Sequence, residues 1–241
     1  MINKLLTPVR TTEYLTDWKV QNYHWAHKIK VNTGEMPDTS ECLIAIIGVN
    51  ESRGSFQNSG ASSGSDIVRK HLYQLAINDY DLHLIDAGDI LIGETVEETY
   101  QNLKMVMEWF LGQQILPIII GGSQDNTIGQ YAGYEFLGQA VNLMVIDERI
   151  DLDEPEFLPP SRTWLQNIFR HEPKYLFNYA GIAYQTHFTS PDILKAIDAL
   201  FFDSIRLGRM KENIQFAEPE VRDADILSLS LIHISEPTRP Y

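Results

Sequence analysis

The stretch Cys42-Leu-Ile-Ala-Ile-Ile-Gly-Val49 decides the fold class of this chain. It is apolar throughout and rich in β-branched residues, which is typical of a strand buried on both faces of a parallel sheet. A loop rich in Gly, Ser and Asn follows, and the sequence then predicts a helix that is capped at Ser65-Asp66 and runs to about Leu75. The run therefore indicates the first strand, loop and helix of an α/β fold.

The alternation of strands and helices continues along the chain. Thr95 and Glu98 form a capping box in front of a long amphipathic helix. We expect further strands at 82–86, 117–122, 141–146, 175–184 and from 225, and further helices at 127–137, 164–170 and 192–201. This order predicts a three-layer α/β/α fold with a mainly parallel sheet and right-handed crossovers.

The predicted sheet also indicates where a ligand binds. In open parallel sheets the binding crevice lies beyond the carboxyl ends of the strands. Those ends are followed here by the loops 50–65, 121–126 and 147–155. We expect the functional residues on these three loops.

The 241 residues are enough for one sizeable α/β domain. Residues 1–40 are mixed in composition, and we expect them to form a leader that packs on the domain. The domain itself is predicted to span 41–228. Residues 229–241 are expected to lie outside it.

Composition excludes several classes of function. The chain has 33 acidic and 19 basic residues and a net charge of −14, which repels nucleic acid and anionic lipid. No stretch approaches the roughly 18 apolar residues of a membrane-spanning helix. Cys42 is the only cysteine, so an internal disulfide is excluded and the residue is expected to be a small apolar side chain. We expect a cytoplasmic protein.

Isolated motifs give weaker signals. His24 and His27 have the spacing of neighbours on a helix, but a metal site needs a third ligand. Gly60-Ala-Ser-Ser-Gly64 matches the pattern around a nucleophilic serine, yet the preceding strand ends at Val49, too early for the required turn. A flexible crevice loop is the better interpretation of Ser62. Asp125 is expected to be the N-cap of the next helix.

Three segments carry a family resemblance. Ile47–Asn50, with Asn58-Ser-Gly-Ala61 and Gly64–Arg69, resembles the first strand, N-x-G-A loop and helix of the ureohydrolase family of arginases, agmatinases and formimidoylglutamases. Pro117–Asp125 lies where that family has P-I-x-x-G-G-D/G-H, and Val145–Asp151 lies where it has D-A-H-x-D. The resemblance covers residues 42–155 and implies an arginase-like fold.

The resemblance also implies an activity. The family hydrolyses formimidoyl, amidine or guanidino compounds with a hydroxide held between two Mn²⁺ ions. Carboxylates and imidazoles suit Mn²⁺, and two dications lower the pKa of the water between them. Carried over to this chain, Gln124, Asp147 and Asp151 occupy metal positions, and Asn58 and Gly60 lie in the substrate loop. A small-molecule substrate and a homo-oligomer are further implications.

The chain departs from the family at both histidine positions of these motifs, which hold Gln124 and Arg149. An amide oxygen is a weak metal ligand, and a guanidinium has no lone pair to give. Arg149 therefore alters the site, and our hypothesis is that it pairs with Asp147 or Asp151 as an internal counter-ion in a metal-depleted crevice. The chain as given is then expected to be inactive.

The third metal motif of the family, S-x-D-x-D, is expected just after Arg222–Ser228. Leu229–Tyr241 stands there instead and resembles translated sequencing adaptor, so we expect the natural protein to continue differently beyond Ser228 and this chain to be truncated. Asp223 and Asp225 precede the last strand, at the edge of the sheet opposite the crevice. Two functions remain open: a formimidoylglutamase-like hydrolase, or an inactive member of the family that binds a small molecule or a protein.

Overall fold

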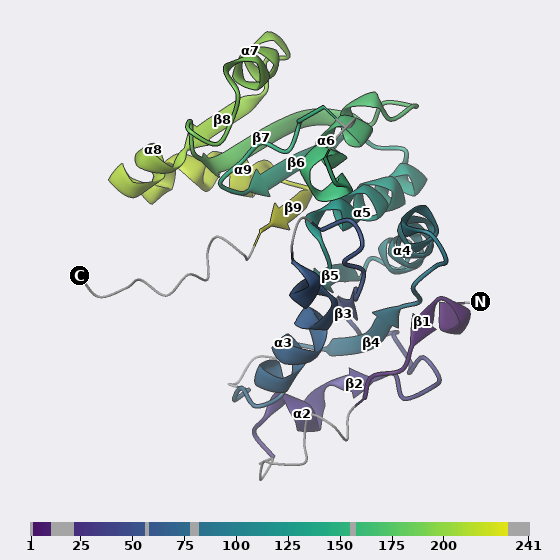
Figure 1. Cartoon of the computed structure of the whole chain (residues 1–241). Coiled ribbons are helices and arrows are strands. Elements are labelled where there is room, and N and C mark those ends of the chain that lie inside the picture. Colours follow the sequence, from purple (N-terminus) through teal and green to yellow (C-terminus); the bar gives the residue numbers. More distant parts are fainter. Residues whose placement is uncertain (1, 11–21, 56–57, 78–81, 155–157, 231–241) are drawn as a thin grey trace. The chain divides into compact units, whose positions relative to one another are not determined.

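The computed structural model describes residues 2–10, 22–55, 58–77, 82–154 and 158–230 (Figure 1). The chain divides into two compact units, with the boundary between Leu137 and Gly138.

The first unit is built on a five-stranded sheet with the strand order β1-β4-β3-β5 and with β2 also paired to β4. Only β1 is antiparallel to its neighbour, which confirms the predicted mainly parallel sheet. The strands are β1 (Leu6–Thr7), β2 (Lys30–Val31), β3 (Ile44–Gly48), β4 (Leu84–Ile90) and β5 (Leu116–Ile120).

Helices cover both faces of this sheet, because successive residues of β3 point to opposite sides and both sides are apolar. Ala45 and Ile47 pack with Leu103 and Phe110 of α4, whereas Ile46 packs with Tyr73 at the end of α3. The helices are α2 (Trp25–Lys28), α3 (Gly64–Leu72), α4 (Val96–Leu111) and α5 (Thr127–Tyr134), with short 3₁₀ turns η1 (Ile2–Lys4), η2 (Ser59–Ser63), η3 (Gln124–Asn126) and η4 (Glu135–Leu137).

The start of α4 confirms the predicted cap. The Thr95 hydroxyl accepts a hydrogen bond of 3.1 Å from the backbone N–H of Glu98. The Glu98 carboxylate in turn accepts one of 2.7 Å from the N–H of Glu94, one residue earlier than in the usual capping box. The helix therefore begins where the sequence places it.

A buried ion pair joins α3 to β4. Arg69 donates two hydrogen bonds, of 2.8 and 2.9 Å, to the carboxylate of Asp86, and both side chains are almost completely buried. Arg69 also pairs with Asp89, and the Tyr73 hydroxyl donates to Asp86 at 2.9 Å. These contacts fix the helix that carries the first predicted crevice loop.

The second unit has a four-stranded, fully parallel sheet with the order β8-β7-β6-β9. Its strands are β6 (Val141–Ile146), β7 (Leu176–Tyr184), β8 (Asp203–Arg206) and β9 (Ile226–Leu229), and its helices are α6 (Pro160–Arg170), α7 (Pro191–Ala199), α8 (Leu207–Glu212) and α9 (Glu218–Asp223), with the 3₁₀ turn η5 (Ile214–Ala217). The sequence did not predict β8, α8 or α9, because each is short and carries little apolar periodicity.

The described strands pair as two sets, one in each unit. β5 pairs only with β3 there, and β6 pairs with β7 and β9. Apolar runs specify burial but not which strands become neighbours, so this pairing could not be read from the sequence. At the amino end of β6, the N–H of Asn142 donates to Asp225 at 2.8 Å, as expected for an acid that precedes the last strand.

The end of the described chain includes part of the segment predicted to lie outside the domain. Leu229 is the last residue of β9 and pairs with Ile146, and the N–H of Ser230 donates to the carbonyl of Ile146 at 3.0 Å. Residues 231–241 lie outside the described residues.

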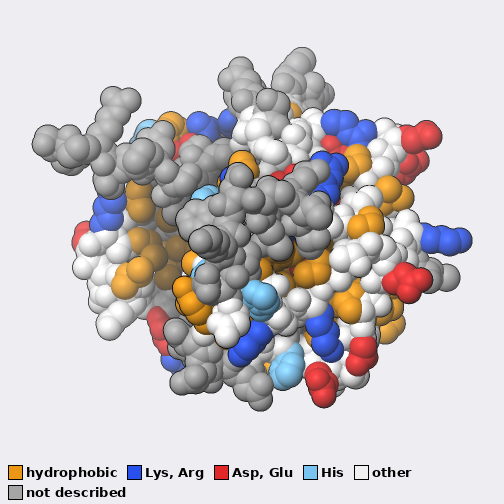
Figure 2. All heavy atoms as spheres, turned by 90° about the horizontal axis from the view of Figure 1, so that it is seen from below, with side chains coloured by type: hydrophobic (Ala, Val, Ile, Leu, Met, Phe, Trp, Pro, Cys, Tyr) orange, Lys and Arg blue, Asp and Glu red, His pale blue; other side chains and the backbone are white. Residues whose placement is uncertain are grey.

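No described helix is both long enough and apolar enough to span a membrane. On the face shown in Figure 2, the described acidic and basic side chains are interspersed among hydrophobic ones and do not gather into a patch of one sign.

Candidate functional site

In the first unit, two of the three predicted crevice loops adjoin. The N–H of Ser123 donates to the carbonyl of Glu51 at 2.9 Å, and the N–H of Gly122 donates to the carbonyl of Ala61 at 3.1 Å. Gly122 has a φ of +77°, and a Cβ there would lie 3.0 Å from the Glu51 carbonyl oxygen. Glycine is therefore required for this close approach of the two loops.

The two adjoining loops carry the predicted substrate residues and the first predicted metal residue. Asn58 is half-buried at the N-cap of η2, and Gly60 is exposed within that turn. Gln124 is half-buried at the start of η3. Ser62 lies inside η2 rather than on a sharp turn between a strand and a helix, so it has none of the geometry of a nucleophile elbow.

The buried carboxylate of Glu51 stabilises the loop 50–65. Glu51 is 1% exposed and accepts hydrogen bonds from Arg53 Nε at 3.0 Å and from the Thr99 hydroxyl at 3.0 Å. Burial alone would raise the pKa of Glu51, but the hydrogen bonds from Arg53 and Thr99 hold it below its usual value. Arg53 also donates to the carbonyls of Gly93 and Glu94, which ties the loop after β3 to the loop after β4.

Asp125 was wrongly predicted to cap a helix. The residue at the N-cap of α5 is Asn126, and Asp125 is instead fully buried, where it accepts a short hydrogen bond from the Tyr100 hydroxyl. Burial raises the pKa of the Asp125 carboxyl above its ordinary value, and the charge of Glu51 adds to the shift. A Cβ on Gly54 would lie 2.3 Å from this carboxylate, so the glycine leaves room for it.

In the second unit, Asp147 and Asp151 follow β6 and are 7% and 6% exposed. Asp147 accepts a hydrogen bond of 3.2 Å from the backbone N–H of Arg149. Asp151 accepts one of 3.2 Å from the indole Nε1 of Trp164 on α6. Burial, with the charge of Asp147 as the next cause, raises the pKa of Asp151 to about 7. The negative charge of Asp147 thus opposes ionisation of the neighbouring Asp151.

The hypothesis that the Arg149 guanidinium pairs with Asp147 or Asp151 was wrong. Its Nε lies 3.6 Å from the carboxylate of Glu148, and its Nη1 donates to the carbonyl of Phe188 at 3.3 Å. Its Cζ stands 4.6 Å from the centre of the Phe188 ring, which adds a cation–π contact. The Arg149 side chain therefore links the loop after β6 to the segment after β7.

Sequence reasoning missed the residues that do surround Asp151. Arg162, in the first turn of α6, places its Nε 3.9 Å from Asp151 Oδ1 and its Nη2 3.3 Å from Asp153 Oδ2. The hydroxyl of Tyr179 on β7 is buried and has no hydrogen-bond partner among the described residues, and burial and the charge of Asp151 raise its pKa. None of these residues has a spacing from Asp151 that the sequence could have revealed.

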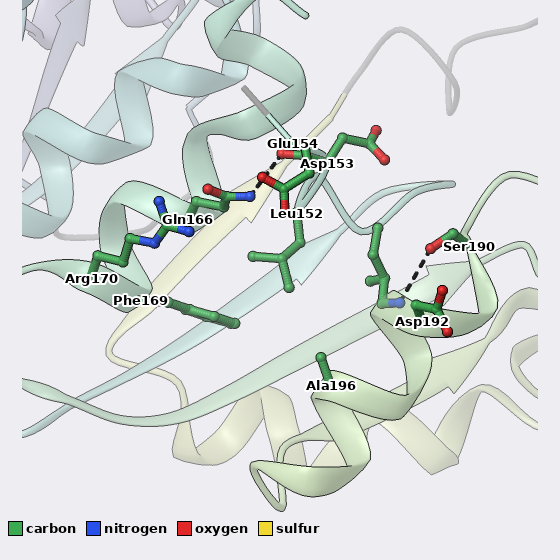
Figure 3. A pocket seen from close by; sticks show the side chains of 10 residues that line it. Leu152, Asp153, Glu154, Gln166, Phe169, Arg170, Ser190, Asp192 and Ala196 are labelled. Carbon is green, nitrogen blue, oxygen red and sulfur yellow. Dashed lines mark hydrogen bonds between the residues drawn. The ribbon is translucent and has the colours of Figure 1, made fainter. Parts of the chain in front are cut away.

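A pocket of about 500 Å³ lies next to this loop, between α6 and the start of α7 (Figure 3). Its apolar lining includes Leu152, Phe169 and Ile193. Its acidic lining comes from both sides and consists of Asp153, Glu154 and Asp192, with Arg170 of α6 as the basic lining residue. The volume is in the range of small-molecule sites.

The residues present fit the two Mn²⁺ ions of the family only in part. Asp147 and Asp151 offer two hard, buried oxygen donors whose repulsion a dication would relieve, which suits one ion. Gln124 and Arg149 cannot replace the imidazoles that a second ion needs. Among the described residues, no group of three or more His, Cys, Asp and Glu side chains is arranged to hold a metal, and that includes His24 and His27.

The chain is similar in sequence to curated formimidoylglutamases. The chain is 28% identical to a formimidoylglutamase of Corynebacterium efficiens over 124 residues, covering 50% of this chain and 39% of the relative. It is 26% identical to one of Lysinibacillus sphaericus over 146 residues, covering 57% and 45%. The chain thus spans less than half the length of these two relatives.

Solved structures show the same fold at low identity. A Trypanosoma cruzi formiminoglutamase with Mn²⁺ superimposes with a TM-score of 0.70 at 18% identity, covering 83% of this chain and 71% of that one. A formimidoylglutamase from Bacillus subtilis gives a TM-score of 0.70 at 18% identity, covering 88% and 69%. The sequence profile of the arginase family matches residues 43–221. Because that match spans more than half of the chain, the protein belongs to the arginase family.

Proposed function

We propose that the protein hydrolyses a C–N bond of a small formimidoyl, amidine or guanidino compound, as a formimidoylglutamase-like enzyme. The observation that carries this proposal is the pair of buried carboxylates, Asp147 and Asp151, directly after β6. In a parallel sheet this is where ligands bind, and in the arginase family it is where metal ligands stand. Formimidoylglutamases among both the sequence relatives and the fold relatives support the same substrate class.

Different residues would hold the metal ion and bind the substrate. Bound to Asp147 and Asp151, a Mn²⁺ ion would supply a water of lowered pKa. Asp153, Glu154 and Asp192 line the adjacent pocket and favour the cationic end of an amidine. Arg162 and Lys195 partly offset the charges of Asp153 and Asp192, so Glu154 contributes most to that preference.

The apolar side of the pocket suits an uncharged stem. Leu152, Phe169 and Ile193 offer a surface for the aliphatic part of such a substrate and exclude water from it. Arg170 adds a positive charge to the lining, which suits a substrate that also carries a carboxylate. The proposed substrate is therefore a short-chain amidine or formimidoyl compound that also bears a carboxylate.

A second candidate is binding without turnover. It is favoured by Gln124 and Arg149 at the histidine positions, and by the hydrogen bond through which Trp164 already occupies one oxygen of Asp151. The protein would then hold the same class of compound, or a protein partner, without cleaving it.

The decisive experiment assays the complete gene product for release of ammonia, formamide or urea from formimidoylglutamate, agmatine and arginine, with and without Mn²⁺. Under the first proposal, Mn²⁺ supports turnover of at least one substrate and Asp147→Ala abolishes it. Asp223→Asn is the matched control, because that acid lies at the amino end of the second sheet and is expected to leave turnover unchanged. No turnover of any substrate, combined with measurable binding of one of them, would establish the second candidate.

A further inference from the structure

The two arginines near the loop after β6 have different surroundings. The guanidinium of Arg149 is held by Glu148, at 3.6 Å, and by the carbonyl and ring of Phe188. Within the part of the chain that the structure describes, only its backbone N–H contacts Asp147, and its guanidinium pairs with neither Asp147 nor Asp151. Its charge is therefore directed toward other partners.

The guanidinium of Arg162, in contrast, contacts Asp151 and Asp153. Its Nε lies 3.9 Å from Asp151 Oδ1, and its Nη2 lies 3.3 Å from Asp153 Oδ2. Its side chain is only 21% exposed, and that of Asp151 is 6% exposed, so water screens this pair weakly. The second oxygen of Asp151 accepts from Trp164 Nε1 at 3.2 Å. Both carboxylate oxygens of Asp151 thus face either a cation or a donor supplied by the start of α6.

Simultaneous binding of a metal ion and a guanidinium to the Asp151 carboxylate is disfavoured by the repulsion between the two positive charges. A dication needs a lone pair of Asp151 and would be brought close to a charge that cannot be neutralised, because arginine keeps its proton. The repulsion between a dication and a unit charge at about 4 Å remains substantial even with strong dielectric screening. Any ion at Asp151 must displace Arg162 or tolerate it.

We infer that Arg162, and not Arg149, competes with a divalent metal ion for Asp151 and so sets the metal affinity of this site. The inference rests on the proposed function only in placing the metal beside Asp147 and Asp151. It assigns control of the metal affinity to a residue of α6 that lies outside the family motifs. Arg162 is a positioning residue here, since it acts through the carboxylate of Asp151.

The test is calorimetric titration of the 241-residue chain with MnCl₂ at neutral pH, for the wild type, Arg162→Gln and Arg149→Gln. Loss of the Arg162 charge is expected to tighten Mn²⁺ binding by about tenfold or more, whereas loss of the Arg149 charge is expected to change it by about twofold or less. Arg162→Lys keeps a cation and is expected to behave like the wild type. Equal affinities for the wild type and Arg162→Gln, or an equal gain in Arg149→Gln, would overturn the inference.

Two further variants keep the test decisive. Arg162→Met removes the charge but keeps a long unbranched side chain at this position of α6, so it replaces Arg162→Gln if that variant unfolds. Adding Asp151→Asn to either variant is expected to cancel the gain, and a gain that persists would place the ion elsewhere and contradict the inference. Tighter Mn²⁺ binding by Arg162→Gln, together with no turnover of any substrate by the complete gene product, would leave this inference intact and refute the proposed hydrolase, so the two failures are distinguishable.

Discussion

The indole Nε1 of Trp164 donates a 3.2 Å hydrogen bond to Oδ2 of Asp151, and both side chains are buried. This contact joins α6 to the loop that carries the predicted metal carboxylates. Above its pKa of about 7, Asp151 is ionised, and a hydrogen bond to a buried charged group contributes more to stability than one between neutral groups, because the charge is costly to leave without a donor.

Trp164→Phe keeps the ring but removes this donor. We expect it to lower the free energy of unfolding by about 1–3 kcal/mol in urea titrations followed by circular dichroism. The double variant with Asp151→Asn completes a thermodynamic cycle, in which the coupling between the two positions is expected to exceed about 0.5 kcal/mol. Strictly additive effects would show that the hydrogen bond contributes nothing.

Arg69→Met leaves Asp86 buried without its main partner. Removing one side of a buried ion pair typically costs about 3–5 kcal/mol, and both side chains are at most 1% exposed here. Asp66→Asn is the matched control, because that carboxylate is 34% exposed and lies 4.0 Å from Arg69. The control is expected to change stability by less than about 0.5 kcal/mol, and similar losses for both variants would contradict the assignment.

Glu51 is expected to make the free energy of unfolding depend on pH. Its folded pKa is held below the ordinary value of 4.5, so the folded state binds the proton less readily than the unfolded chain. The stabilisation is therefore complete above that value and is lost as the pH falls through the folded pKa. Unfolding free energies measured from pH 7 to pH 3 are expected to decline less steeply for Glu51→Gln than for the wild type. Parallel curves would contradict this.

Gly54 and Gly60 offer a paired test of the first crevice loop. A Cβ on Gly54 would overlap the buried carboxylate of Asp125, so Gly54→Ala is expected to cost about 1–3 kcal/mol. A Cβ on Gly60 meets nothing closer than the Asn58 side chain at 3.5 Å, so Gly60→Ala is expected to change stability by less than about 0.5 kcal/mol. Thermal melts of the two variants decide the matter, and equal melting temperatures would refute the steric argument.

The sequence by itself determined the strands and helices that are long and periodic. The apolar run 42–49 became β3, Val141–Ile146 became β6, and Thr95 capped α4, because burial on two faces and capping are local properties of the chain. The family motifs also located Asp147 and Asp151 directly after β6, since a loop position follows from the strand before it.

Only the tertiary structure decided which side chains meet. Arg149 lies two residues from Asp147 and Asp151 in sequence but places its guanidinium against Glu148 and Phe188, whereas Arg162, eleven residues beyond Asp151, faces that carboxylate. The order of the strands within each unit was likewise not visible in the sequence. Side-chain direction and strand pairing depend on contacts between segments far apart in the chain, which no local pattern of residues encodes.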